Sequence, residues 1–286
     1  MNKEFLDLAE QLKSSVSCTV RLNELMSGHT SFKIGGPADI LVLPESIEQL
    51  REVLKVVKET VVPLTLLGNG SNVLVRDKGI RGIVIKLGNM LRHFYEAEDL
   101  LVFGSGYSLA LASYKAMECG KTGMEFAVGI PGSIGGAVYM NAGAYDGEMQ
   151  NIVNCVKVMD LQGNERVLTA EELNFGYRKT SLQNSGLIVT EVTLKMPSGN
   201  KDEIKSKMDD FSHRRISKQP LEMPSAGSMF KRPPGYFAGT LIDQAGLKGY
   251  TVGGAQISTK HAGFVVNVGG ATAADVLQLI KDVQTK

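Results

Sequence analysis

The pattern of hydrophobic and polar positions predicts short helices along the whole chain. Segment 5–15 carries apolar residues at helical spacing and predicts a first helix that ends before Val16. Ser46 and Gln49 form a capping pair ahead of a second helix, which runs to about Thr60. Further helices are predicted over residues 108–118, around 204–211, over 237–245 and from Thr272 to the end.

Apolar or alternating runs between these helices predict strands. Segment 154–169 predicts a hairpin that turns at Gln162 to Asn164. The other predicted strands cover residues 40–43, 63–67, 72–75, 82–87, 93–98, 100–105, 186–196 and 263–268. The sheet-rich middle region ends at a Pro-Ser-Gly-Asn linker, so three domains are predicted over residues 1–81, 82–199 and 200–286.

Composition and charge narrow the class of protein. The 286 residues are 43% hydrophobic and 21% charged, with a net charge of +1, so neither nucleic acid nor a membrane is expected as a partner. Cys18, Cys119 and Cys155 are widely spaced, which indicates reduced thiols rather than a disulfide framework or a zinc motif. No leader pattern is present, and we expect a cytoplasmic protein without an obligate protein partner.

Three glycine-rich segments stand out in the first 150 residues. They cover residues 31–39 (SFKIGGPAD), 66–75 (LLGNGSNVLV) and 129–147 (GIPGSIGGAVYMNAGAYDG). Glycine lets the backbone reach positive φ and approach a ligand closely, and converging amides bind phosphate. Each loop alone could be an ordinary turn, but three together favour a large phosphorylated cofactor.

Two common nucleotide-binding patterns are absent from the sequence. Gly104 and Gly106 lie between an apolar strand and a helix, but Leu109 replaces the third glycine of G-x-G-x-x-G. We interpret these two glycines as turn residues. The P-loop pattern G-x-x-x-x-G-K-[ST] does not occur, which argues against a P-loop hydrolase.

Basic residues gather between positions 213 and 232, where Glu222 is the single acid. This local excess suggests an anionic ligand, although a solvated helix end is the common explanation for Arg214 and Arg215. The basic residues are His213, Arg214, Arg215, Lys218, Lys231 and Arg232. The four histidines, His29, His93, His213 and His261, lack the spacing of metal ligands, so no metal is expected.

Six segments in this order resemble the UDP-N-acetylenolpyruvoylglucosamine reductase (MurB) family, in the branch that lacks a tyrosine-bearing insertion. The resemblance extends from about residue 20 to the end of the chain. The segments are HTSFKIGGPAD, LGNGSNVLV, GIPGSIGGAVYMNAGAYDGE, FGYRKT, PSAGSMFKRPPG and GGAQISTKHAGFVVN.

This resemblance implies an FAD-dependent enzyme of bacterial cell-wall (peptidoglycan) precursor synthesis. In the family, NADPH reduces a non-covalently bound FAD, and hydride then passes from flavin N5 to C3 of the enolpyruvyl group of the UDP-sugar. Protonation at C2 gives UDP-N-acetylmuramate. The implied fold is α+β, with a vanillyl-alcohol-oxidase-type (PCMH-type) FAD-binding domain of two α+β subdomains, 1–81 and 82–199, and a C-terminal α/β substrate domain, 200–286.

The resemblance also assigns roles to individual residues. Arg178 matches the family's arginine that stabilises the charge arising after hydride transfer, and Ser228 matches its proton donor, with Lys231 as a candidate to support it. The cofactor residues implied are Lys33, Ile34, Gly35, Gly36, Gly68, Asn69, Gly70, Ser71, Asn72, Pro131, Gly132, Ser133, Gly135, Gly136, Asn141, Ala142, Gly143 and Tyr145. The substrate residues implied are Tyr177, Lys218, Lys231, Arg232, Gln256 and Asn267.

One departure from the family pattern concerns a glutamate. The family carries a catalytic glutamate in a C-terminal motif resembling L-x-P-E-V-R, whereas no glutamate follows Glu222 here. The final helix also has no stop signal at Lys286, so a missing tail is expected. Two other hypotheses stay open: a flavin oxidase of the same fold acting on a sugar or alcohol, and a non-catalytic nucleotide-binding module.

Overall fold

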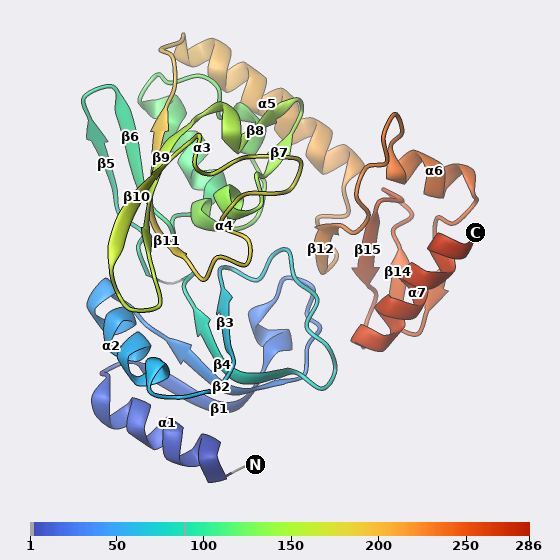
Figure 1. The fold of residues 1–286 in the computed structure, drawn as a ribbon. Helices are drawn as coiled ribbons and strands as arrows, with labels where there is room; N and C mark the ends of the chain where they lie inside the picture. Colours follow the sequence, from blue (N-terminus) through green and yellow to red (C-terminus); the bar gives the residue numbers. More distant parts are fainter. Residues whose placement is uncertain (1–2, 89) are drawn as a thin grey trace. The chain divides into compact units, whose positions relative to one another are not determined.

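The computed structural model describes residues 3–88 and 90–286. The chain forms two compact units, each assembled from three segments (Figure 1). The first unit contains Met1–Arg21, Ile40–Asn69 and Ile83–His213. The second unit contains Leu22–Asp39, Gly70–Gly82 and Arg214–Lys286. The division into domains 1–81, 82–199 and 200–286 stays a prediction.

A four-stranded sheet has the order β1-β2-β4-β3. Its strands are β1 (Thr19–Leu25), β2 (Pro37–Leu43), β4 (Ile80–Lys86) and β3 (Leu64–Leu67). The last two run parallel, with Leu67 opposite Lys86. Helix α2 (Ile47–Lys58) connects β2 to β3, and α1 (Lys3–Ser15) packs beside it. The capping prediction is confirmed, because Ser46 Oγ accepts from the Gln49 N–H at 3.2 Å.

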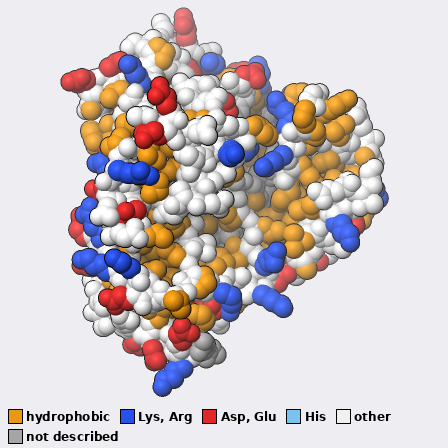
Figure 2. Space-filling model, viewed as in Figure 1, with side chains coloured by type: hydrophobic (Ala, Val, Ile, Leu, Met, Phe, Trp, Pro, Cys, Tyr) orange, Lys and Arg blue, Asp and Glu red, His pale blue; other side chains and the backbone are white. Residues whose placement is uncertain are grey.

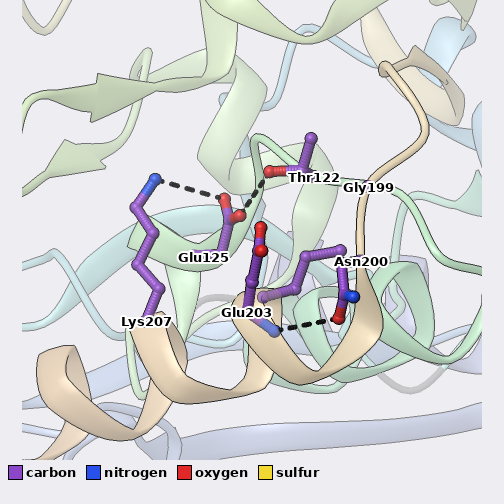
Figure 3. Close-up of a pocket in the computed structure, with 7 residues that line it drawn as sticks. Thr122, Glu125, Gly199, Asn200, Glu203 and Lys207 are labelled. Carbon is purple, nitrogen blue, oxygen red and sulfur yellow. Dashed lines mark hydrogen bonds and ion pairs between the residues drawn. The ribbon is translucent and has the colours of Figure 1, made fainter.

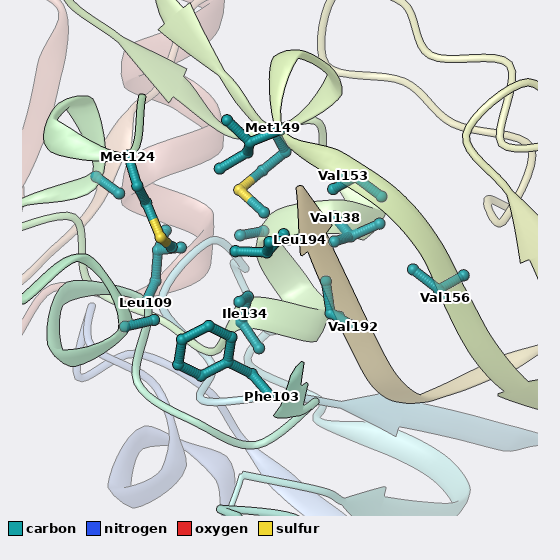
Figure 4. Packing of buried hydrophobic residues seen from close by; sticks show 14 of the residues in the cluster. Phe103, Leu109, Met124, Ile134, Val138, Met149, Val153, Val156, Val192 and Leu194 are labelled. Carbon is teal, nitrogen blue, oxygen red and sulfur yellow. The ribbon is translucent and has the colours of Figure 1, made fainter. Parts of the chain in front are cut away.

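A five-stranded antiparallel sheet forms the centre of the first unit. Its order is β10-β9-β11-β6-β5. The strands are β10 (Glu165–Thr169), β9 (Val153–Met159), β11 (Ile188–Lys195), β6 (Leu100–Gly104) and β5 (Phe94–Ala97). Helices α3 (Leu109–Glu118) and α4 (Ile134–Tyr139) cover one face, where Phe103, Ile134 and Val192 meet in the core (Figures 1 and 4).

Helix α5 (Lys201–Lys218), which the sequence predicted around residues 204–211, follows this sheet and packs on the first unit through Ile204, Met208 and Phe211. The chain also contains three short helical turns, of which η1 belongs to the second unit and η2 and η3 to the first, and a small hairpin in the first unit. They are η1 (Met26–His29), η2 (Glu125–Ala127), η3 (Met149–Asn151), β7 (Gly143–Ala144) and β8 (Gly147–Glu148). None of the helices within residues 3–88 and 90–286 is long and apolar enough to cross a bilayer.

The second unit is built on a four-stranded antiparallel sheet of order β12-β15-β14-β13. Its elements are β12 (Ser225–Ser228), β13 (Thr251–Val252), β14 (Ala255–Ile257), β15 (Phe264–Asn267), α6 (Ala238–Gln244) and α7 (Ala273–Thr285). Phe32 and Ile34, from the first glycine-rich segment, are buried in this core. Asp77 accepts from the N–H groups of Ala273 and Ala274 at 2.7 and 2.9 Å, and so fixes the start of α7.

The predicted strand over residues 72–75 is wrong. This segment has no strand pairing in the structure. The segment follows Gly70, which has a left-handed backbone conformation with φ 71°. Its side chains pack against the first glycine-rich segment: a Cβ at Gly35 would lie 2.9 Å from Val75 Cβ. The Gly36 N–H donates to Arg76 O at 3.0 Å. Packing against the first glycine-rich segment therefore replaces a sheet partner.

Candidate active site

The glycine-rich segment 129–147 forms a turn, a short helix and a hairpin. Helix α4 begins after Ser133, whose Oγ accepts from the Gly136 N–H at 3.3 Å. The N–H groups of Ile134 and Gly135 donate to Tyr107 O and Ser105 O, both at 2.9 Å. The N–H groups of residues 134–136 therefore donate to acceptors within the protein. An anion bound at the start of α4 would have to use the N–H groups of the residues that precede Ile134.

The two amides before α4 are available for such an anion. Among the residues that the structure describes, none accepts from the N–H groups of Gly132 and Ser133. Gly132 has φ 126°, a conformation that favours glycine. Gly135 is required by close packing instead, because a Cβ at this position would lie 2.7 Å from Ser105 Cβ.

The second glycine-rich loop presents amides of the same kind. No acceptor within the described parts of the chain takes the N–H groups of Gly68, Asn69 or Gly70. A Cβ added at Gly68 would lie 3.3 Å from Ser133 Oγ, so this loop lies directly beside the start of α4. Lys86 is half-buried opposite Leu67 in the adjacent strand, and burial lowers its pKa.

Asn141 holds the hairpin of the third glycine-rich segment together. Its side chain is fully buried, and Nδ2 donates to Glu148 Oε2 and Gly176 O, both at 3.1 Å. Its Oδ1 accepts from the Gln150 N–H at 3.0 Å. All polar atoms of this side chain are engaged with the protein, so the predicted cofactor residue shapes the loop in this structure.

Arg178 also binds this hairpin. Its Nη1 donates to Asn141 O at 3.0 Å and its Nη2 to Gly143 O at 2.8 Å. Arg178 itself has φ 56°, and the Tyr177 ring centroid lies 5.1 Å from its Cζ. The predicted catalytic arginine therefore lies at the glycine-rich hairpin, although it comes from a distant loop.

The first glycine-rich segment belongs to the second unit. Lys33 is exposed with φ 58°, and Ile34 is buried. A Cβ at Gly36 would lie 1.9 Å from Asp77 O, and one at Gly70 would lie 2.2 Å from His29 O. Close backbone packing therefore requires glycine at both positions, whether or not a cofactor is bound. Of the neighbouring predicted residues, Ser71 is half-buried and Asn72 is exposed.

Ser228 is exposed at the end of β12, opposite Phe264. Gly227, with φ 79°, lies at the register shift that precedes it. Bulges of this kind redirect the next side chain and are frequent beside active sites. Arg178 belongs to the first unit and Ser228 to the second.

His261 is a candidate that the sequence did not distinguish from a structural histidine. Its Nδ1 accepts from the Gly263 N–H at 3.1 Å, which leaves Nε2 as the protonated nitrogen. Its ring contacts the Phe264 ring at 5.1 Å, and Phe264 lies opposite Ser228. Burial lowers the pKa of His261, which favours the neutral imidazole. The only sequence signal was its place in the segment GGAQISTKHAGFVVN.

The remaining predicted substrate residues differ in how they are held. Lys218 and Lys231 are exposed, whereas Arg232 packs its guanidinium 4.3 Å from the Phe237 ring centroid. Gln256 donates to Thr251 Oγ1 at 3.0 Å. Asn267 is buried and donates to Phe32 O at 3.2 Å, so it connects two segments of the second unit.

Exposed hydrophobic side chains lie beside Arg232. Tyr236 and Phe237 are each 61% exposed and Leu241 is 40% exposed. Figure 2 shows hydrophobic side chains, in orange, gathered on the surface of the second unit. These side chains give the basic residues around Arg232 an apolar border.

A polar pocket of about 180 Å³ lies between η2 and the start of α5, and none of the residues that line it is a predicted site residue (Figure 3). At its base Glu125 is only 3% exposed. Its carboxylate accepts from Thr122 Oγ1 at 2.6 Å and from the Gly123 N–H at 2.8 Å, and Lys207 Nζ lies 3.9 Å away. The carboxylate therefore joins α5 to the turn that precedes the third glycine-rich segment.

Glu125→Ala should lower the free energy of unfolding by about 1–3 kcal/mol, because it leaves two donors without their buried acceptor. Urea unfolding of the apoprotein measures this change. Glu203→Ala is the matched control: Glu203 lines the same pocket but is exposed, so a loss of at most about 0.5 kcal/mol is expected. Equal losses in the two variants would contradict the assigned role of Glu125.

Comparisons with known proteins agree with these features. Residues 219–286 match the family described as UDP-N-acetylenolpyruvoylglucosamine reductase, C-terminal domain, and residues 38–169 match the FAD binding domain family. A UDP-N-acetylenolpyruvoylglucosamine reductase of Clostridioides difficile (strain 630) is 51% identical over 261 residues, 91% of this chain and 86% of that protein. The chain belongs to the UDP-N-acetylenolpyruvoylglucosamine reductase family. A protein of the same name from Clostridium perfringens (strain SM101 / Type A) is 51% identical over 281 residues, 98% of this chain and 91% of that protein.

Solved structures confirm the predicted fold class. The crystal structure of the MurB reductase from Thermus caldophilus has a TM-score of 0.81 and 40% identity, covering 94% of this chain and 95% of that one. A single-residue variant of berberine bridge enzyme has a TM-score of 0.50 at 15% identity over 68% of this chain and 44% of that one, which shows fold likeness alone. The α+β class with a PCMH-type FAD-binding domain is confirmed, and so is the assignment to FAD-dependent oxidoreductases.

Proposed function

We propose that this chain reduces UDP-N-acetyl-3-O-(1-carboxyvinyl)glucosamine to UDP-N-acetylmuramate with NADPH, in peptidoglycan precursor synthesis. The observation that carries the proposal is the pair of adjacent loops whose amides lack acceptors in the described residues, at Gly68–Asn69 and Gly132–Ser133. Amides that converge from two glycine-rich loops fit a diphosphate such as that of FAD. Lys86, in the strand beside the Gly68–Asn69 loop, adds positive charge.

Bound FAD would supply hydride chemistry between NADPH and the enolpyruvyl group. The loops Gly68–Asn69 and Gly132–Ser133 hold the proposed cofactor residues that can contact FAD through their backbone. Asn141 and Arg178 instead maintain the shape of the β7–β8 hairpin. Tyr145 lies in the same hairpin and Ala142 directly precedes it, and residues 33–36 and 70–72 remain proposed cofactor residues.

Two residues are proposed for the reaction itself. A cation near the enolpyruvyl carboxylate would stabilise charge that develops after hydride arrives, and the Arg178 guanidinium is the candidate. A positioned hydroxyl must then deliver a proton to C2, and Ser228 is exposed at a bulged strand end that can present it. Tyr177, Lys218, Lys231, Arg232, Gln256 and Asn267 remain proposed substrate contacts or supports.

Turnover distinguishes this function from a flavin oxidase. We expect NADPH consumption to depend on the enolpyruvyl UDP-sugar and to be insensitive to oxygen removal, with UDP-N-acetylmuramate identified by mass spectrometry. An oxidase would instead consume oxygen with a sugar or alcohol and ignore the UDP-sugar. The substrate and NADPH are the proposed partners, and a cytoplasmic location stays a prediction; all three cysteines are free thiols in the structure.

Gly68→Ala tests the proposed diphosphate site. A Cβ there would enter the space between the two loops, so the dissociation constant for FAD should rise about 10-fold or more, as a loss of about 1.4 kcal/mol gives. Quenching of flavin fluorescence on titrating apoprotein measures the constant. Gly28→Ala is the control, because a Cβ at Gly28 meets nothing within 4 Å. Unchanged FAD affinity in Gly68→Ala would place the diphosphate elsewhere.

A further inference from the structure

The tip of the β7–β8 hairpin is held in an unfavourable backbone conformation. Ala144 pairs with Gly147, so Tyr145 and Asp146 are the two turn residues, with φ of 50° and 63°. Two-residue turns with positive φ at both positions normally use Asn-Gly or Asp-Gly. Non-glycine residues in this region persist where surrounding contacts hold them, and such strain is frequent at binding loops.

Helix α5 supplies one of these contacts. The rings of Tyr145 and Phe211 are stacked, with centroids 4.5 Å apart and an angle of 15° between planes. Phe211 is 8% exposed and packs in a cluster with Val128, Ile204 and Met208. The stack therefore joins the hairpin tip to a buried cluster rather than to a mobile surface side chain.

The same helix and the hairpin are connected by a second route. Lys207 Nζ lies 5.8 Å from the Phe211 ring centroid and 3.9 Å from Glu125 Oε2. Glu125 begins η2, and the next residue, Phe126, contacts the hairpin so closely that a Cβ at Gly147 would lie 2.6 Å from its ring. Helix α5 thus contacts both the hairpin tip and the turn beneath it.

We propose that Phe211 is a positioning residue for FAD, which acts through Tyr145 by holding the strained hairpin 143–148 in its cofactor-binding conformation. The proposal rests on the proposed function, in which this hairpin borders the FAD site. Arg178 holds the base of the hairpin through Asn141 O and Gly143 O, and Phe211 holds its tip. No sequence pattern marks this role of Phe211, because its partner is 66 residues away in the chain.

Phe211→Leu removes the stack but keeps an apolar side chain in the cluster. The dissociation constant for FAD should rise about 3- to 10-fold, as expected for the loss of an aromatic pair. Phe211→Tyr keeps the stacking and should restore affinity to within about twofold. Both constants come from fluorescence titration of apoprotein, which needs no turnover.

Ile204→Ala is the control for general damage to α5, because Ile204 lies in the same cluster and packs against Gly199. Both Ile204→Ala and Phe211→Leu should lower the Tm of the apoprotein, but only Phe211→Leu should reduce the increase in Tm that saturating FAD gives. Wild-type FAD affinity in Phe211→Leu, or an equal loss in Ile204→Ala, would overturn the proposal. A wild-type protein that binds no FAD would instead refute the proposed function.

Discussion

Ser228→Ala should leave flavin reduction by NADPH within about twofold of wild type and slow reoxidation by the enolpyruvyl substrate by about 10²- to 10⁴-fold. The proton to C2 would come from the Ser228 hydroxyl, whereas reduction by NADPH needs no such donor. The serine is exposed at the end of β12, after the left-handed Gly227, so its removal leaves no buried cavity. Anaerobic stopped-flow absorbance follows the two half-reactions separately.

Ser225→Ala is the matched control for this experiment. Ser225 begins the same strand opposite Val266, and its carbonyl, which accepts from Ser31 Oγ at 2.7 Å, is retained in the variant. Both half-reactions should stay near wild type. If Ser228→Ala slowed both half-reactions equally, or slowed neither, Ser228 would not be the proton donor.

Arg178→Ala should have two separable effects. Loss of the hydrogen bonds to Asn141 O and Gly143 O loosens the hairpin, so FAD should bind more weakly. At saturating FAD, reoxidation by substrate should still be about 10²- to 10³-fold slower, because a preorganised donor for the developing charge is missing. Titration fluorescence measures the first effect and stopped-flow absorbance the second.

Arg178→Lys refines this test. A lysine keeps the positive charge but cannot reach two carbonyl oxygens as the guanidinium fork does. We therefore expect the lysine variant to keep the weaker FAD binding and to recover part of the rate with substrate. Full recovery of the rate in Arg178→Ala once FAD is saturating would mean that Arg178 serves only to hold the hairpin.

Local signals in the sequence were sufficient for most helices and for the hairpin over residues 154–169. Ser46, Ser108 and Thr272 each cap the helix that the apolar periodicity predicted, and Gly246, with φ 69°, follows the end of α6. Such elements depend on contacts within a few residues. The five-stranded sheet likewise contains the predicted hairpin of β9 and β10.

Elements that depend on distant partners were not predictable in this way. Residues 72–75 look like a strand by composition, but packing of Val75 against Gly35 removes them from a sheet. Strands β1, β12, β13 and β14 were missed because they are short or weakly apolar and are specified by their neighbours.

The roles of individual side chains in the candidate site also depend on distant partners and could not be predicted from local sequence. Resemblance to the family selected Asn141 and Arg178, but only the structure shows that both are engaged with the hairpin backbone. Glu125 and Phe211 carry no motif, since their roles come from the contacts of α5 with a segment far away in sequence. Within the described residues, no acceptor binds the N–H groups of Gly68 and Asn69. Only the hydrogen bonds around the whole loop could reveal this.

The most direct test of the central claim is an anaerobic double-mixing experiment on the FAD-loaded protein. NADPH should bleach the flavin absorbance in the first mix. The enolpyruvyl UDP-sugar should restore it in the second, with one UDP-N-acetylmuramate formed per flavin. Restoration by oxygen but not by the enolpyruvyl UDP-sugar, or restoration without that product, would contradict the proposed function.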